Sequence, residues 1–244
     1  MCKALMFDLH GKYGFFKNHE QNSVNMTYQF IPKVTLEGLL GAIIGLDGWR
    51  QMKEHNGKLE YYEVFKNSKI AITPKTPYFE VFYETINNCT GFENKGGTTA
   101  NIARQILKNP CYTVILKQDS IEEGYYNKLK EMLFKGESIY RICLGNNRYT
   151  ANIDSVKEID LNKVKETKEI IINSLIREDV VNEIYEENED GIMGYELHIS
   201  YPTDYNIKSD YGHCKENIIY SNHYIDIDND LNLYEYNNNI YYFL

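Results

Sequence analysis

The sequence predicts an α+β fold in which a ferredoxin-like domain carries an inserted segment and is followed by a β-rich C-terminal region. Short β-type runs alternate with two helix-type segments in the order strand, helix, strand, strand, helix, strand. A glycine- and asparagine-rich stretch interrupts this order between about residues 77 and 109. RNA-recognition motifs have the same element order, but many activities share it, so the fold alone does not define a function.

The N-terminal part supplies the first strand and the first helix. Residues 3–9, KALMFDL, form a short apolar run that is typical of a strand. Thr35 is predicted as the N-cap of the following helix, with Glu37 in its first turn, where a carboxylate favours the helix dipole. We expect this helix to run to about Leu46.

Three glycines interrupt this helix. Gly38, Gly41 and Gly45 are spaced so that they share one helix face, although each costs about 1 kcal/mol relative to alanine. A face without side chains lets a helix lie close to a sheet, to another chain or to the backbone of a ligand. Packing within the fold and contact with a partner both remain open from the spacing alone.

The remaining elements of the first domain follow from local patterns. Residues 59–73 contain strand-like material, most clearly at residues 69–73, and residues 78–83 and 111–117 are also strand-like. Residues 101–108 fit either a helix or a strand. The motif from Ser120 to Glu123 predicts a capping box that opens a second helix, and this helix ends at Gly136. Tyr126, Leu129, Met132 and Leu133 would form its buried face. Residues 138–153 are predicted as strand, tight turn and strand.

The 244 residues carry a formal net charge of −9, which argues against general affinity for nucleic acid. The charge is uneven, because residues 1–117 have a net charge of +4 and residues 118–244 a net charge of −13. Residues 178–190 contain seven acids and no base, a pattern typical of a solvated face. A polyanionic partner would therefore meet the first half of the chain.

Composition also predicts the compartment. No apolar run approaches the roughly 20 residues of a membrane-spanning helix, and the N-terminus lacks the pattern of a signal peptide. The five cysteines are scattered without a CxxC pair, which is typical of reduced thiols. We therefore expect a cytoplasmic protein without membrane contact.

The sequence predicts neither a metal site nor a cofactor. His213 and Cys214 form an isolated pair, and residues 226–230, DIDND, lack the glycine and glutamate of a calcium loop. The glycine pair in residues 11–14 lacks the third glycine of a dinucleotide-binding fingerprint. His10, at the end of the first strand, is the histidine that we consider for general acid–base cleavage of RNA.

The loop before the first helix mixes cations with aromatic rings. Lysines 12, 17 and 33 alternate there with Tyr13, Phe16 and Tyr28. Lysines track phosphates, and stacking of a base on an aromatic ring contributes about 1–3 kcal/mol. This mixture predicts a surface for single-stranded RNA.

Residues 7–45 carry a more specific pattern, in which a strand, a glycine-aromatic loop, Thr27-Tyr28, Pro32 and a glycine-spaced helix follow one another. This stretch resembles the opening of the CRISPR-associated Cas5 (Cas five) family, whose members cap the 5′ end of the guide RNA in type I Cascade complexes. Residues 104–116 and 138–153 also resemble the family, and the overall pattern is similar to type I-B members.

The resemblance implies a fold, partners and a site. Residues 1–155 would form a ferredoxin-like RAMP domain, residues 77–109 a thumb that reaches the backbone subunit, and residues 156–244 a β-rich extension packed on the first domain. The partners would be the crRNA 5′ handle, the backbone and large subunits and a separate nuclease of the Cas six type. The expected RNA-binding residues are Lys12, Tyr13, Phe16, Lys17, Tyr28, Lys33, Gly38, Gly41, Lys95, Arg104, Asn146 and Arg148.

One branch of the family processes RNA itself with a tyrosine, a lysine and an adjacent histidine. In this sequence Lys117 is followed by Gln118, and no Lys-His dipeptide occurs. The resemblance therefore favours a non-catalytic subunit without catalytic residues. A metal-independent endoribonuclease that processes CRISPR repeat RNA is the alternative, and a protein–protein adaptor without an RNA role is a third hypothesis.

Overall fold

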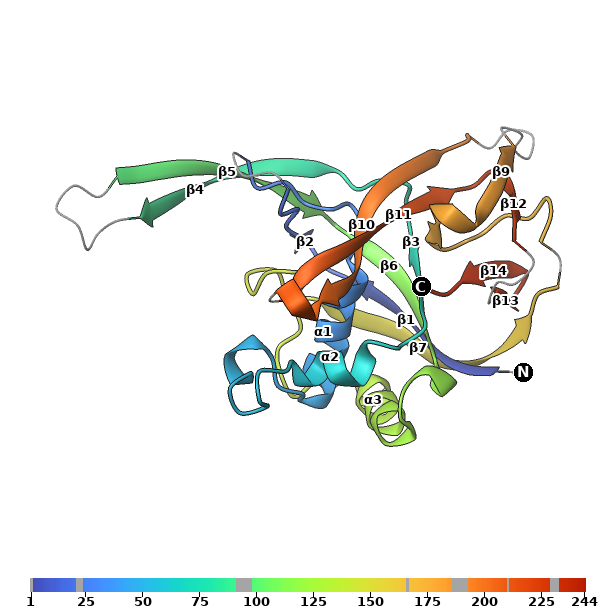
Figure 1. The fold of residues 1–244 in the computed structure, drawn as a ribbon, viewed down its shortest axis with the longest axis horizontal. Coiled ribbons are helices and arrows are strands. Elements are labelled where there is room, and N and C mark those ends of the chain that lie inside the picture. The colour runs from blue at the N-terminus through green and yellow to red at the C-terminus, as the bar shows by residue number, and fades with distance from the viewer. Residues whose placement is uncertain are drawn as a thin grey trace.

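The computed structural model describes residues 2–20, 24–90, 98–165, 167–185, 193–209, 211–228 and 233–244 (Figure 1). A six-stranded antiparallel sheet with the spatial order β14-β13-β7-β1-β6-β3 forms its centre. The strands are β1 Cys2–His10, β3 Ile70–Pro74, β6 Cys111–Lys117, β7 Asn152–Lys163, β13 Leu233–Tyr236 and β14 Asn239–Tyr242.

Three helices lie together beside this sheet, α1 Lys33–Ile44, α2 Glu60–Phe65 and α3 Glu123–Lys135 (Figure 1). Short 3₁₀ turns occur at Trp49–Gln51, Gln118–Ser120, Glu178–Val180 and Ile207–Ser209. In β1 the side chains of Leu5, Phe7 and Leu9 join the main core, whereas Ala4 joins a second, smaller cluster. This alternation places apolar contacts on both faces of the sheet.

The order β1, α1, β3, β6, α3, β7 agrees with the expected succession of strand, helix, strand, strand, helix and strand. The strands over residues 3–9, 69–73 and 111–117 are confirmed. The earlier part of the strand-like segment 59–73 instead forms the helix α2, and of residues 78–83 only the part from Val81 onward is in a strand. Residues 101–108, which fit either type of element, form a strand. Residues 138–153 form the expected strand pair only in part, because an isolated bridge at Cys143 and Thr150 and two further backbone hydrogen bonds join the two sides of the turn, and only residues 152 and 153 belong to a strand, β7. The N–H groups of Ile139 and Tyr140 instead donate to carbonyls at the C-terminus of α1, which draws this segment away from the sheet.

The expected N-cap of α1 was wrong. The helix begins at Lys33, and Pro32 is its N-cap, with φ −58° and no side-chain capping bond. The carbonyl of Pro32 accepts hydrogen bonds from the N–H groups of Thr35 and Leu36 at 3.0 and 2.9 Å. Proline fits a helix start because its φ is already close to helical and it has no N–H to satisfy. Gly45 ends the helix in the left-handed region, with φ 80°.

The start of α3 also differs from the prediction. Glu122 is the N-cap, and the Ser120 hydroxyl donates to the Lys117 carbonyl at 2.7 Å within a 3₁₀ turn, so it does not form a capping box. The predicted end at Gly136 is confirmed, because this residue has φ 66°. The buried face is confirmed for Tyr126, Leu129 and Leu133, and Met132 is partly buried beside them.

A long antiparallel hairpin lies within residues 77–109, the segment that interrupts the predicted element order. Its strands are β4 Val81–Thr90 and β5 Thr98–Lys108, and they extend outward from the rest of the protein (Figure 1). At its base β5 also pairs with the short strand β2 Tyr13–Gly14. The loop after β1 is therefore attached directly to the base of the hairpin.

The C-terminal half is rich in strands, as expected. It contains β8 Ile176–Arg177, β9 Val181–Tyr185, β10 Glu196–Asn206, β11 Gly212–Ser221 and β12 Tyr224–Ile227. The strands β10, β11 and β8 form one sheet and β9 pairs with β12. β13 pairs with β7, and backbone hydrogen bonds join Leu244 to Ile70 at the opposite edge of the central sheet. The division into residues 1–155 and 156–244 stays a prediction, and its boundary falls inside β7.

Among the described residues, no helix combines the length and the hydropathy that crossing a lipid bilayer requires.

Candidate nucleic-acid interface

The base of the β4–β5 hairpin carries an exposed cation beside three aromatic rings. The Lys12 ammonium lies 5.4 Å from the centre of the Tyr13 ring. That ring meets the Phe82 ring edge-to-face at 5.3 Å and the Tyr149 ring at 6.2 Å. These contacts fix Tyr13 while Lys12 remains exposed to solvent.

Glu84 on β4 links the two arginines expected at the site. Its carboxylate lies 3.4 Å from Arg104 and 3.5 Å from Arg148, and it accepts a hydrogen bond from the Tyr149 hydroxyl at 3.1 Å. Arg104 is 16% exposed and stacks over Phe15, whereas Arg148 is 61% exposed. Two cations share one carboxylate, so the cluster keeps a net positive charge, and Arg148 is its more accessible cation.

The loop after Leu144 packs against Phe15, which directly follows β2. Gly145 has φ 76°, and a Cβ at this position would lie 2.0 Å from the Phe15 carbonyl oxygen, so a close approach requires glycine here. The Asn146 side chain accepts the Arg148 N–H at 3.0 Å, and its carbonyl accepts the Tyr149 N–H. Asn146 therefore shapes the loop that presents Arg148.

Next to this loop lies a hollow of about 370 Å³ at the start of α1. Its lining residues are Phe15, Phe16, Lys17, His19, Pro32, Thr35, Trp49, Gly145, Tyr205, Tyr211 and His213. Lys17 is exposed, and among the described residues it forms no ion pair. His19 and His213 meet edge-to-face at 5.1 Å, and burial, followed by neighbouring positive charge, lowers the pKa of both imidazoles.

A second hollow of about 420 Å³ continues along α1. It is lined by Val34, Thr35, Gly38, Ala42, Leu46, Gly48, Trp49, Gln51, Tyr61, Tyr140 and Tyr205. Thr35, Trp49 and Tyr205 line both hollows. The two hollows are therefore adjoining parts of one groove, which we call the aromatic groove.

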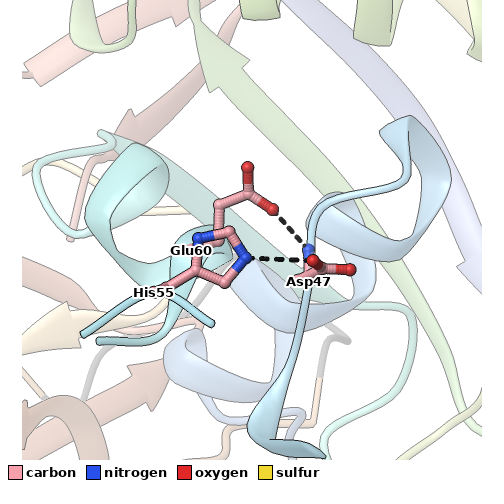
Figure 2. A group of neighbouring side chains, drawn as sticks. All are labelled: Asp47, His55 and Glu60. Atoms are coloured by element: carbon pink, nitrogen blue, oxygen red, sulfur yellow. Dashed lines mark hydrogen bonds and ion pairs between the residues drawn. The ribbon is translucent and has the colours of Figure 1, made fainter. Parts of the chain in front are cut away.

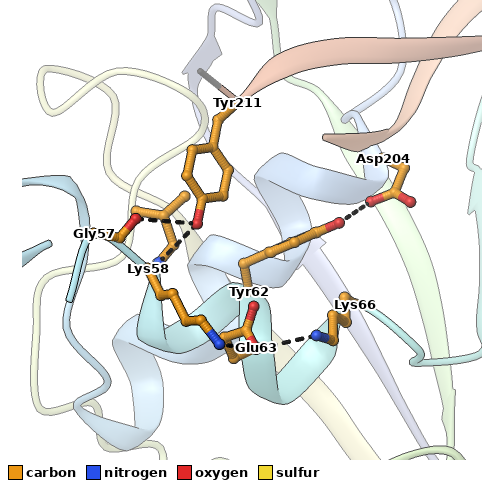
Figure 3. Close-up of polar contacts among 8 residues, drawn as sticks. Gly57, Lys58, Tyr62, Glu63, Lys66, Asp204 and Tyr211 are labelled. Carbon is orange, nitrogen blue, oxygen red and sulfur yellow. Dashed lines mark hydrogen bonds and ion pairs between the residues drawn. The ribbon is translucent and has the colours of Figure 1, made fainter. Parts of the chain in front are cut away.

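The end of β10 and the residue before β11 are held against α2 and the segment before it, beside this groove. The Tyr62 hydroxyl donates to Asp204 at 2.5 Å, and the Tyr211 hydroxyl accepts the Leu59 N–H at 3.3 Å and lies 3.4 Å from the Gly57 carbonyl (Figure 3). Burial, then the hydrogen bond to Asp204, raises the pKa of the Tyr62 hydroxyl above its ordinary value. These contacts fix the part of the groove wall that includes Tyr211 against α2 and the segment before it.

The structure places several expected RNA-binding side chains inside the protein. Phe16 is 2% exposed and packs near Tyr112, and Tyr28 is 5% exposed. The Tyr28 hydroxyl lies 3.3 Å from the Asn18 side chain, and the Tyr28 N–H donates to the Phe16 carbonyl at 2.8 Å. These two rings support the loop from beneath and do not offer a free face to a base.

Lys33 is also buried, at 8% exposure, with its ammonium 3.6 Å from the Glu37 carboxylate. Glu37 is 1% exposed, and the Ser68 hydroxyl lies 3.4 Å from it. Burial, partly offset by Lys33, raises the pKa of Glu37 to about 8. In this fold the Lys33 side chain takes part in an internal polar cluster and does not lie on the surface.

The glycine face of α1 packs against α2. A Cβ at Gly41 would lie 2.5 Å from the Cβ of Tyr61, and a Cβ at Gly38 would lie 3.5 Å from the Tyr61 ring. Gly41 therefore permits the close approach of two helices, whereas Gly38 also lines the aromatic groove. Gly45 serves as the C-cap, so the regular spacing of the three glycines has two different structural causes.

Of the twelve residues expected at the site, Lys12, Tyr13, Arg104, Asn146 and Arg148 come together at the hairpin base, and Lys17 borders the groove. Lys95 lies outside the described residues. The sequence interpretation missed Trp49, Tyr140 and Tyr205. Trp49 had one signal, since it is the only tryptophan and follows the glycine-spaced helix directly.

One group of side chains has the composition of a metal site. Ligand atoms of Asp47, His55 and Glu60 lie within 4.8 Å of one another (Figure 2). Glu60 accepts the Asp47 N–H at 2.6 Å, and the His55 imidazole hydrogen-bonds the Asp47 carboxylate at 2.9 Å. These bonds close the loop between α1 and α2, and they account for the short distances within the group.

The residues considered for catalysis lie apart from the groove. The His10 imidazole is 3.0 Å from Asp154. Lys117 is 8% exposed in its side chain, hydrogen-bonds the Tyr234 hydroxyl at 2.9 Å and lies 3.5 Å from Asp119. The Lys117 ammonium is thus held in internal contacts at the end of β6.

A family model described as CRISPR-associated protein (Cas_Cas5) matches residues 4–233. The chain therefore belongs to this family of CRISPR-associated proteins, as the opening residues predicted. A search of curated proteins finds no match.

Among solved structures, a CRISPR protein from Archaeoglobus fulgidus has a similar fold, with a TM-score of 0.52 and 12% identity, over 98% of this chain and 97% of that chain. A chain of a CRISPR RNA-guided surveillance complex aligns with a TM-score of 0.49 and 16% identity, over 91% of both chains. A chain of a type III-B Cmr-beta complex bound to cognate target RNA and AMPPnP aligns with a TM-score of 0.46 and 11% identity, over 92% of this chain and 86% of that chain.

Proposed function

We propose that this chain is a non-catalytic subunit of a type I CRISPR Cascade, similar to type I-B, that binds and caps the 5′ handle of crRNA in antiviral defence. The observation that carries the proposal is that the hairpin base adjoins the aromatic groove, since Phe15 lines the groove and its ring lies under Arg104 of the hairpin. Exposed cations and aromatic rings from sequence-distant segments meet there, in a chain whose net charge is −9. Family membership supports the assignment to a CRISPR complex.

In this proposal the cations contact handle phosphates and the rings contact its bases. Lys12, Lys17 and Arg148 are exposed and provide the phosphate contacts. Phe16, Tyr28 and Lys33 act indirectly, because they hold the loop and the start of α1 in place.

The remaining parts of the fold have proposed roles in the assembly. The elements β1, α1, β3, β6, α3 and β7 are the ferredoxin-like RAMP core, with the spatial strand order β7-β1-β6-β3. The β4–β5 hairpin is the thumb, which contacts the backbone subunit. The large subunit is a second partner, processing belongs to a separate Cas six-type nuclease, and the assembly is cytoplasmic.

Co-expression of this chain with its genomic neighbours and a repeat array tests the proposal. We expect a large particle that contains crRNA, and we expect no RNA in the particle when Lys12→Glu, Lys17→Glu and Arg148→Glu are combined. Removing one phosphate-binding cation should reduce the slope of log affinity against log salt by about 0.7. Lys128→Glu on α3 is the matched control, since this exposed lysine lies outside the proposed surface.

Two results would contradict the proposal. One is a particle that retains RNA with unchanged salt dependence when all three cations are reversed. The other is specific cleavage of a repeat transcript by the purified chain in EDTA, abolished by His10→Ala, because this would establish the endoribonuclease alternative.

A further inference from the structure

The aromatic groove is built around the single tryptophan of the chain. Trp49 is 50% exposed although its ring is held by two neighbours. It meets the Tyr205 ring at 5.9 Å and the Tyr211 ring at 5.4 Å, in both cases nearly perpendicular. Within the described part of the chain no ring stacks parallel to the indole. Trp49 is therefore fixed in orientation while part of its surface remains open to solvent.

The supports of Trp49 are themselves fixed. The Tyr205 hydroxyl lies 3.4 Å from the Tyr61 hydroxyl, and the Tyr205 ring also meets the Tyr62 ring at 5.4 Å. A ring that is held before a ligand binds loses little conformational freedom on binding. The arrangement thus has the rigidity of a preformed site.

A second exposed ring borders the same hollow. Tyr140 is 45% exposed, and its N–H donates to the Ala42 carbonyl at the end of α1. Its hydroxyl lies 3.4 Å from the Asp47 carboxylate, which His55 also holds. Ala42 and Gly38 add little side-chain bulk between these rings.

Charge and size indicate the kind of occupant. Among the described residues that line the two hollows there is no aspartate or glutamate, although acids outnumber bases in the chain. Lys17 and two histidines line the hollow next to Trp49. Volumes of about 420 and 370 Å³ lie within the range of pockets that hold small molecules.

We infer that the aromatic groove seats one unstacked base of a single-stranded RNA on Trp49, between Tyr140 and Tyr205, with the adjoining phosphate directed toward Lys17. This inference rests on the proposed RNA-binding function and specifies a position in the surface. Thr35 lines both hollows, so it lies where the hollow that contains Tyr140 meets the hollow that contains Lys17.

The single tryptophan makes the test direct. The full chain is titrated with an octamer of riboadenosine and with an abasic octamer of the same charge, while Trp49 emission and the anisotropy of a labelled octamer are recorded. We expect saturable quenching by the adenosine octamer and no quenching by the abasic one. Trp49→Ala should weaken binding by about 5- to 150-fold, because stacking contributes about 1–3 kcal/mol per base.

Trp49→Phe should retain most of the affinity, since phenylalanine still offers a ring. Phe134→Ala, which removes a similarly exposed ring from α3, should bind as the unaltered chain does. Circular dichroism establishes that each variant is folded. Unchanged affinity in Trp49→Ala, equal quenching by the abasic octamer, or no binding of either octamer would overturn the inference.

These outcomes are separate from those of the proposed function. If the particle contains crRNA but its Trp49→Ala form binds RNA normally, the base site is wrong and the capping role survives. If Trp49 emission changes only when a protein subunit is added, the groove docks a protein and the inference fails. If no particle contains RNA, the proposed function itself is wrong.

Discussion

Replacing Gly41 by alanine adds one methyl group where α1 lies closest to α2. The added Cβ would be 2.5 Å from the Cβ of Tyr61, a separation that carbon atoms do not tolerate. The obstacle is the first atom of the Tyr61 side chain, which cannot rotate away without movement of the helix backbone. Gly41→Ala therefore requires α1 and α2 to separate by part of an ångström or more.

Gly38→Ala in the same helix is the matched control. A Cβ at Gly38 would lie 3.5 Å from the Tyr61 ring, which is ordinary van der Waals contact. Both substitutions gain about 0.8–1.0 kcal/mol of helix propensity. Only Gly41→Ala also incurs an overpacking cost of about 1–3 kcal/mol. We expect Gly38→Ala to raise the free energy of unfolding, and Gly41→Ala to be less stable than Gly38→Ala by about 1–3 kcal/mol.

Urea and thermal unfolding, followed by circular dichroism, measure both variants. For a chain of this length 1 kcal/mol corresponds to a change in Tm of about 2–4 °C. The two variants should therefore differ by about 2–12 °C, with Gly41→Ala the lower. If Gly41→Ala were as stable as Gly38→Ala, close helix packing would not be the reason for the glycine, and contact with a ligand would become the better explanation.

Two further predictions concern pH. Burial raises the pKa of Glu37 from 4.5 to about 8, so between these pH values the folded protein binds the proton more tightly than the unfolded chain does. The free energy of unfolding therefore falls as pH rises, by an amount on the order of 3 kcal/mol between pH 5 and pH 8. Glu37→Gln should remove this fall, which urea unfolding at the two pH values measures. The hydrogen bond to Asp47 raises the pKa of His55, so its stabilising contribution is complete below the unfolded pKa of about 6.5 and is lost as pH rises through the folded value. Asp47→Asn should return the His55 pKa toward 6.5 in an NMR titration, and an unchanged value would exclude this pairing.

Local patterns predicted most of the central sheet and the helices α1 and α3, but not the helix α2. The apolar runs of β1 and β6 and the buried face of α3 were recognisable because their side chains repeat with the period of a strand or a helix. The first residues of α1 and α3 were not predicted, since Pro32 and Glu122 act as N-caps without a capping side chain. Residues 138–153 were predicted only in part, because the first residues of this segment form hydrogen bonds with the end of α1 and not with a strand.

The candidate site was predicted in part. Lys12, Tyr13 and Arg148 lie in one surface, as predicted. Lys33 was expected to contact RNA at the surface, but its side chain is buried and paired with Glu37. A sequence shows that a lysine and an aromatic residue are near each other along the chain. It does not show which of them the packed core will cover.

The periodic strands and helices, the charge imbalance between the halves and the family of the chain could all be read from the amino-acid sequence. The periodic patterns depend on residues that are neighbours along the chain, and the charge and the family follow from the kinds and the order of the residues. Three-dimensional packing was needed to show that Phe16 and Tyr28 are buried and that Trp49, Tyr140 and Tyr205 border one groove. Burial and contact between distant segments follow from how α1, the β10–β11 turn and the loop before β7 pack together, and no local pattern contains that information.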